Sequence, residues 1–112
     1  MVDPDYFSLN TAVKELFPQP CTNVPEIGNE AAQAEKILSE FTEAKEAFDH
    51  EQSLDCTVPP SERVAARSHT NEEIADVITA CITWLNMRGL DQYDRIRLYR
   101  SINDKNKARN YL

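Results

Sequence analysis

The chain has 112 residues, 41% of them hydrophobic and 28% charged, which leaves room for one domain with a modest core. It contains only two glycines and no alternating runs of β-branched residues, so an all-α fold is favoured over a sheet. The formal net charge of −7 argues against duplex nucleic acid as a partner, because neutralising phosphates requires a basic surface.

The first 28 residues are predicted to form a short helix and a connector. Over residues 5–17, apolar side chains recur every three or four positions, which is typical of one face of a helix. Pro18 ends this pattern, because proline removes a backbone donor and restricts the residue before it. Residues 18–28 contain three prolines and no evident chemistry, so they are interpreted as a connector to the helices of residues 29–112.

Residues 29–52 are predicted to form a long amphipathic helix that carries the first pair of acids. Glu40 and Glu43 are three residues apart, so their side chains are neighbours on the helix surface, and they border the apolar stripe on the same flank as Lys36. The alternative interpretation is a solvated charged face, with Lys36 paired to Glu40 at spacing i, i+4. The apolar stripe consists of Ala34, Ile37, Phe41, Ala44 and Phe48.

Residues 53–70 are predicted to form a loop. The Pro59–Pro60 pair disfavours helix there, and several serine and threonine residues add turn chemistry. A loop of this length in a small domain is often a lid or a binding loop. His50 and His69 have no partners at a metal-binding spacing and are interpreted as surface residues.

Residues 71–88 are predicted to form a second major helix with the second pair of acids, Glu73 and Asp76. An alternative explains Glu73 alone: Thr70 acts as the N-cap and Glu73 closes a capping box at the third helical position. Trp84 on the same flank is either a core residue or a platform for a base. The apolar stripe consists of Ile74, Val77, Ile78, Cys81 and Leu85.

Residues 92–109 are predicted to form a last helix, with Gly89 ending the preceding one and Asp91 as the new N-cap. Residues 1–87 carry 16 acids and 5 bases, a net charge of −11, whereas residues 88–112 carry 3 acids and 7 bases, a net charge of +4. The basic end either contacts phosphates, through Lys105, Asn106 and Arg109, or docks on the acidic body as a fraying helix. The charges alone leave both readings open.

The three cysteines are an odd number at wide spacing, which fits neither a zinc site nor a disulfide framework. The N-terminus lacks the basic and apolar regions of a signal peptide, and no apolar stretch approaches the ~20 residues that cross a bilayer. We therefore expect an intracellular protein with reduced cysteines and no membrane partner.

The two acid pairs predict a common site if their helices face each other. Four carboxylates would then meet in a small volume, where they repel one another unless cations are bound. Oxygen-rich sites of this kind suit Mg²⁺ or Mn²⁺. The sequence therefore predicts a metal site made of Glu40, Glu43, Glu73 and Asp76.

The pattern Glu-x-x-Glu followed by Glu-x-x-Asp, with Lys36 upstream and a Lys-Asn-x-x-Arg end, resembles the MazG-like nucleoside triphosphate pyrophosphohydrolases of the all-α NTP pyrophosphatase superfamily. The short form with this end is similar to versions from phages and prophages. The resemblance covers about residues 30–111. It departs from the family in the long separation of 29 residues between the pairs, and in Ser39 and Thr42.

The resemblance implies that the four acids bind Mg²⁺ and that Lys105 and Asn106 contact the phosphates or the substrate. Lys36, Arg109 and Trp84 are further candidate substrate contacts. The resemblance also implies hydrolysis of an NTP or dNTP to the monophosphate and pyrophosphate, with one acid as general base, in the cytoplasm or the host cytoplasm. The implied fold is an antiparallel bundle of four main helices, completed as a homodimer or homotetramer. Two alternatives stay open: a nucleotide-binding protein without turnover, and a helical interaction protein.

Overall fold

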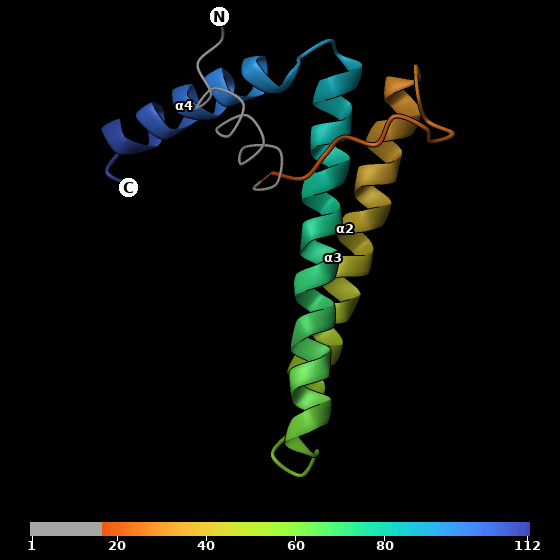
Figure 1. The fold of residues 1–112 in the computed structure, drawn as a ribbon. Helices are drawn as coiled ribbons and strands as arrows, with labels where there is room; N and C mark the ends of the chain where they lie inside the picture. The colour runs from red at the N-terminus through yellow and green to blue at the C-terminus, as the bar shows by residue number, and fades with distance from the viewer. Residues whose placement is uncertain (1–16) are drawn as a thin grey trace, which may run out of the picture.

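A computed structural model of the chain describes residues 17–112. Three helices occur in this range, α2 (Glu30–Ser53), α3 (Pro60–Met87) and α4 (Gln92–Ala108), and none of the described residues forms a β-strand (Figure 1). The prediction of an all-α fold is confirmed for this part of the chain. The helix predicted over residues 5–17 lies outside the described residues, apart from Phe17, which precedes the connector.

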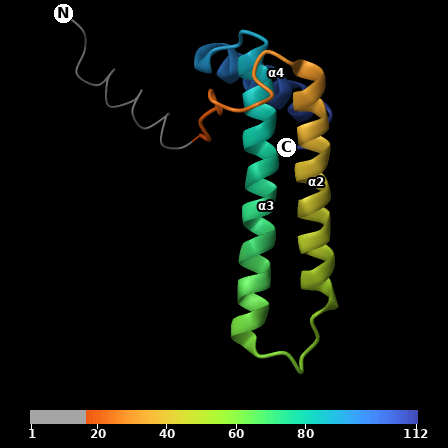
Figure 2. The same ribbon diagram turned by 90° about the vertical axis from the view of Figure 1, so that its right-hand side faces the viewer.

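Helices α2 and α3 form a long antiparallel hairpin, and residues 54–59 join them at one end (Figures 1 and 2). The molecule is elongated, with principal extents of 61 × 33 × 33 Å. Helix α4 leaves the other end of the hairpin crosswise and extends to one side of both helices in Figure 1, whereas in Figure 2 it is seen behind the top of the hairpin. The hairpin is therefore the only extensive helix pair among the described elements.

Small side chains line the contact between α2 and α3. Ala44 and Ala47 of α2 and Ala66, Thr70 and Ala80 of α3 are buried there. Small residues allow two helix axes to approach closely, since the interaxial distance depends on the size of the side chains at the contact.

One polar residue of α2 is almost completely enclosed by this contact. Gln33 is 2% exposed and donates from Nε2 to the carbonyl oxygen of Ala80 over 2.9 Å. A satisfied buried hydrogen bond of this kind contributes roughly 0.5–1.5 kcal/mol and fixes how the two helices are aligned.

The predicted apolar stripes are only partly buried, and this part of the prediction is wrong. In α2, Phe41 is 59% exposed and Phe48 is 44% exposed; in α3, Ile74 and Ile78 are each 48% exposed. Ala44 is the one buried member of the α2 stripe, and the seam passes from it to Ala47 and Gln33 on the neighbouring flank. In α3 the seam runs through Ala66, Thr70 and Ala80, which lie outside the predicted stripe. Leu38 of α2, 60% exposed, adds to the apolar side chains left open by this rotation.

The loop predicted over residues 53–70 is also wrong for residues 60–70, because α3 already begins at Pro60. Proline fits the first position of a helix, where its missing N–H has no intrahelical partner in any case. Thr70 consequently lies inside α3, buried, with its hydroxyl donating to the carbonyl oxygen of Ala66 over 3.1 Å. It caps no helix, so the capping-box explanation of Glu73 fails.

The other helix ends follow the sequence closely. Asn29 caps α2, its Oδ1 accepting from the backbone N–H of Ala32 over 3.0 Å. Asp91 caps α4 in a reciprocal box with Asp94, and Gly89 takes a positive φ of 85° in the turn before it. None of the described helices combines the length and apolar character needed to cross a bilayer.

The first turns of α4 are fixed to the hairpin by a buried arginine. Arg95 is 8% exposed and donates to the carbonyl oxygen of Leu90, in the turn before α4, over 2.7 Å, and to Oδ1 of Asn86 in α3 over 3.4 Å. Beyond it the apolar side chains Leu98 and Ile102 are 37% and 41% exposed. The direction of α4 is therefore set at its N-terminal end, and its C-terminal half extends outward.

The position of Thr70 leads to a stability prediction. Thr70→Val should change the free energy of unfolding by less than about 0.5 kcal/mol, because valine keeps the volume and has a similar helix propensity. Asn29→Ala removes a true N-cap and should cost about 0.5–2 kcal/mol. Urea denaturation at one protein concentration compares the two variants. An equal loss of unfolding free energy in both variants would indicate that Thr70 acts as an N-cap after all.

Candidate metal centre

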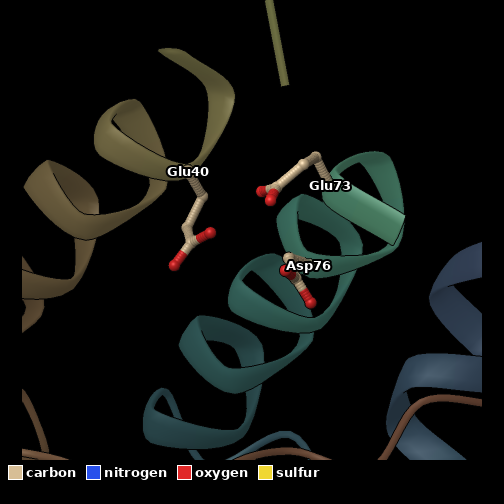
Figure 3. A group of neighbouring side chains, drawn as sticks. All are labelled: Glu40, Glu73 and Asp76. Carbon is tan, nitrogen blue, oxygen red and sulfur yellow. The ribbon is translucent and has the colours of Figure 1, made fainter. Parts of the chain in front are cut away.

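The hairpin brings three of the four predicted acids into one group. Glu40 projects from α2, and Glu73 and Asp76 project from α3, into the space between the helices (Figure 3). One carboxylate oxygen from each lies within 4.8 Å of the others. These residues come together because α2 and α3 are antiparallel, so the middle of one helix meets the middle of the other.

Two of these carboxylates are drawn out of solvent by the packing. The side chain of Glu40 is 15% exposed and that of Glu73 is 16% exposed. The Oε2 atom of Glu73 is buried and has no hydrogen-bond partner among the described residues. Its other oxygen lies 3.7 Å from Nε2 of His69. A buried acceptor without a partner costs roughly 1–3 kcal/mol, and more when it is charged.

Glu43, the fourth predicted ligand, is not part of the three-carboxylate group. It lies one turn further along α2, on the wall of a neighbouring depression that also includes His50 and His69. The negative charge of Glu40 raises the pKa of Glu43 above its ordinary value, and Glu73 adds to the effect. The raised pKa of Glu43 indicates that the electrostatic potential around the cluster is negative. Both histidines are exposed, as predicted for surface residues.

Lys36 is the cation nearest to the group. Its Nζ lies 3.1 Å from Oε1 of Glu40, and that interaction raises the pKa of Lys36. The ion pair of the alternative interpretation is therefore present, and it coexists with the cluster. One exposed lysine at i, i+4 contributes only about 0.3–0.5 kcal/mol, and no lysine or arginine among the described residues forms an ion pair with Glu73 or Asp76.

A cavity of about 240 Å³ opens directly beside the cluster, and Glu40, Asp76 and Lys36 form part of its wall. Sequence reasoning missed most of its other lining residues. Gln33 shares a flank of α2 with Lys36 and Glu40, which was a usable signal, whereas no periodicity pointed to the connector. The remaining lining residues are Cys21, Val24, Glu26, Thr79, Ala80 and Thr83.

Trp84 lies away from the cluster, toward the end of the hairpin that carries α4. Its indole N–H donates to Oε1 of Glu30 over 2.8 Å, and Arg88 donates to the same oxygen over 2.6 Å. The Trp84 hydrogen bond, followed by that of Arg88, lowers the pKa of Glu30. Trp84 thus joins α3 to the first turn of α2, roughly 12 Å along the helix from Asp76.

The basic end of the chain is not brought to the cluster of its own chain. About 16 Å of α3 separates Asp76 from Met87, and about 20 Å of α4 then separates Gln92 from Lys105, at the ordinary rise of an α-helix. Figure 1 shows that α4 runs crosswise to the hairpin and away from its side. Within the described residues, no ion pair joins the hairpin to the three predicted contacts, Lys105, Asn106 and Arg109.

A scan against models of known protein families finds no match to this chain, and searches of curated proteins and of solved structures find no similar protein. The resemblance to MazG-like enzymes therefore continues to depend on the sequence motifs alone.

The Oε2 atom of Glu73, which has no partner among the described residues, leads to a prediction about metal binding. In the absence of divalent ions, Glu73→Gln should raise the melting temperature, because it removes a like charge from the cluster. Mg²⁺ should stabilise the wild type, by about 2.7 kcal/mol at a hundred times its dissociation constant, and stabilise the variant much less. Thermal melts with EDTA or Mg²⁺ measure both effects.

The matched control is Glu72→Gln, an exposed acid on the adjacent position of α3. It should respond to Mg²⁺ as the wild type does. An equal Mg²⁺ response in the wild type and in both variants would show that the cluster binds no ion.

Proposed function

We propose that this protein hydrolyses a nucleoside triphosphate, either NTP or dNTP, to the monophosphate and pyrophosphate, with Mg²⁺ held by Glu40, Glu73 and Asp76. The observation that carries the proposal is the meeting of these carboxylates from two helices, with one buried oxygen of Glu73 lacking a partner. A solvated charged surface does not explain a carboxylate that the packing itself encloses.

The donor set fits a hard divalent cation. All three groups offer carboxylate oxygen, and the cluster contains neither the thiolate nor the imidazole that favours zinc or copper. Three carboxylates also leave room for phosphate oxygens, as in sites that hold Mg²⁺ together with a polyphosphate. Mn²⁺ has the same ligand preference and should substitute.

When bound, the cation supplies charge neutralisation at the phosphates and assists deprotonation of the attacking water. Lys36, at the edge of the cluster, donates to phosphate oxygens. Glu43, one turn along α2 from Glu40 and beside Glu73 in the neighbouring depression, accepts the proton of the water. The water oxygen bonds to the α-phosphorus, the bond from that phosphorus to the bridging oxygen breaks, and pyrophosphate leaves.

A second candidate is nucleotide binding without turnover. It is favoured by the position of Glu43, which stands outside the three-carboxylate group. A chain of this kind would hold Mg²⁺ and nucleotide and release no pyrophosphate. Turnover separates the two candidates directly.

The test is a panel of NTPs and dNTPs with Mg²⁺, read as pyrophosphate release. The wild type should turn over at least one member, and Asp76→Asn should lower kcat/KM by about a hundredfold or more, because it removes a charged metal ligand. Glu35→Gln, an exposed position on α2, should keep full activity. Full activity in Asp76→Asn would show that the active site lies elsewhere. Binding without release would establish the second candidate.

We further propose that the active protein is a homodimer or homotetramer. On a helical wheel, Leu38 and Phe41 lie opposite Lys36 and Glu43, and Ile74 and Ile78 lie opposite Asp76. The hairpin thus presents an exposed apolar face on the side away from the cavity. Patches of this kind mark association surfaces, and a second hairpin supplies a matching face.

The distribution of charge supports a role for the basic helix α4 in such an assembly. Residues 30–87 carry 12 acids and 4 bases, a net charge of −8, whereas residues 92–109 carry 6 bases and 2 acids, a net charge of +4. The basic end points away from its own cluster, so the phosphate contacts proposed for Lys105, Asn106 and Arg109 are made in the site of a second copy. Opposite charge favours that contact.

Mixing two defective chains tests this assignment. Asp76→Asn lacks a ligand, and a chain truncated after Ile102 lacks the basic end, so each alone should lose at least tenfold in kcat/KM, or about 1.4 kcal/mol. After subunit exchange, mixed dimers contain one intact site, and an equal mixture should regain about a quarter of wild-type activity. No recovery would place the basic end outside the partner's site. Full activity of the truncated chain would remove its role altogether.

The cysteines support a proposal about the compartment. Cys21, Cys56 and Cys81 are all free and exposed thiols. Exposed thiols persist in reducing compartments, where disulfides are rare. We therefore propose that the protein acts in the cytoplasm, or in the host cytoplasm if it is encoded by a phage.

A further inference from the structure

The connector, in which sequence analysis finds no chemistry, builds one wall of the cavity beside the cluster. Cys21, Val24 and Glu26 line that wall, facing residues of α2 and α3. The backbone N–H of Cys21 donates to Oγ1 of Thr83 over 3.0 Å, and Thr83 is 2% exposed. The connector is thus tied to the buried part of α3, and the cavity is a built feature of the fold.

The cavity extends from the cluster along the hairpin. Glu40 and Asp76 line its end at the cluster, and Gln33 and Thr83 line its other end. Each of the latter residues is seven positions from the acid on its own helix, which is roughly 10 Å at the ordinary helical rise. A group attached to phosphates held at the cluster therefore has about that length of cavity available. At about 240 Å³, the cavity suits part of a ligand and not a whole nucleotide.

The polar atoms on this wall are mainly hydrogen-bond acceptors. Gln33 uses Nε2 to bond Ala80, and its amide oxygen has no partner among the described residues. The hydroxyl of Thr79 donates to the carbonyl oxygen of Ala75, which leaves its lone pairs to accept. Glu26 adds a carboxylate. Such a wall is complementary to a group that presents O–H or N–H donors.

We propose that this cavity binds the nucleoside part of the substrate, with its phosphates at the cluster and its sugar hydroxyls and base N–H groups directed toward Glu26, Gln33 and Thr79. The apolar side chain of Val24 lies against the rings. The identity of the ligand depends on the proposed function, whereas the cavity, its acceptors and its place beside the cluster do not. The connector is accordingly the segment that selects among nucleotides.

Cys21 is a built-in reporter of occupancy. It is an exposed thiol on the cavity wall, while Cys56 in the loop between α2 and α3 and Cys81 on α3 are exposed thiols outside the cavity. The full chain is treated with a maleimide, and labelling of each cysteine is followed by mass spectrometry. The probes are Mg²⁺ with α,β-methylene analogues of the four NTPs, and Mg²⁺ with inorganic triphosphate, which lacks a nucleoside.

At ten times its dissociation constant, at least one analogue should slow labelling of Cys21 about tenfold and leave Cys56 and Cys81 unchanged. Inorganic triphosphate should slow none of them. If no analogue protects Cys21, or if triphosphate protects it equally, the proposal is overturned. Protection of Cys21 without pyrophosphate release from any nucleotide would support nucleoside binding in the cavity and contradict the proposed enzymatic activity. Pyrophosphate release without protection of Cys21 would support the enzymatic activity and contradict nucleoside binding in this cavity.

A pair of matched substitutions gives a second measurement. Val24→Trp fills the cavity from the connector, and Val64→Trp places the same bulk on an exposed position near the opposite end of α3. By calorimetry with Mg²⁺, Val24→Trp should weaken binding of the protecting analogue at least tenfold and leave triphosphate binding unchanged, and Val64→Trp should alter neither. Unchanged analogue binding in Val24→Trp overturns the proposal. If Val24→Trp fails to fold, the labelling of the wild-type chain decides alone.

Discussion

The close contact of α2 with α3 along small side chains is the constraint on which the site depends. Alanines at the seam let the helices approach, and the Gln33–Ala80 hydrogen bond fixes their alignment. At that alignment Glu40 meets Glu73 and Asp76, and the packing encloses an oxygen of Glu73 that nothing in the described chain satisfies. The hairpin thus holds carboxylates together against their mutual repulsion, which is the condition for binding a cation strongly.

The cluster was accessible from sequence because spacing i, i+3 places two acids on one helix face whatever the tertiary contacts are. The sequence does not predict which side chains form the contact between α2 and α3. Leucine, phenylalanine and isoleucine predict burial, yet Phe41 and Ile74 remain exposed and the alanines are buried, because which flank faces the partner helix is decided by close packing. The Pro59–Pro60 pair predicts a break in helical structure, yet Pro60 begins α3, because proline is favourable at a first helical position.

Contacts between segments that are far apart in the sequence cannot be predicted from hydrophobic periodicity. Cys21 and Thr83 are 62 positions apart, and their hydrogen bond has no signature in either local sequence. It nevertheless builds the cavity wall next to the cluster. The hydrogen bond from Trp84 to Glu30 is likewise not predictable from local sequence. It joins the two helices at one end of the hairpin and holds the indole ring away from the three-carboxylate cluster. In our account the hairpin supplies the metal centre, the connector supplies selectivity, and α4 serves a second copy.

The central claim is that a divalent cation binds between α2 and α3. Anomalous diffraction from crystals grown with Mn²⁺ tests it most directly, because the method locates the ion itself. The account predicts an anomalous peak within bonding distance, roughly 2.0–2.3 Å, of carboxylate oxygens of Glu40, Glu73 and Asp76. A structure at saturating Mn²⁺ with no peak between these residues would contradict it.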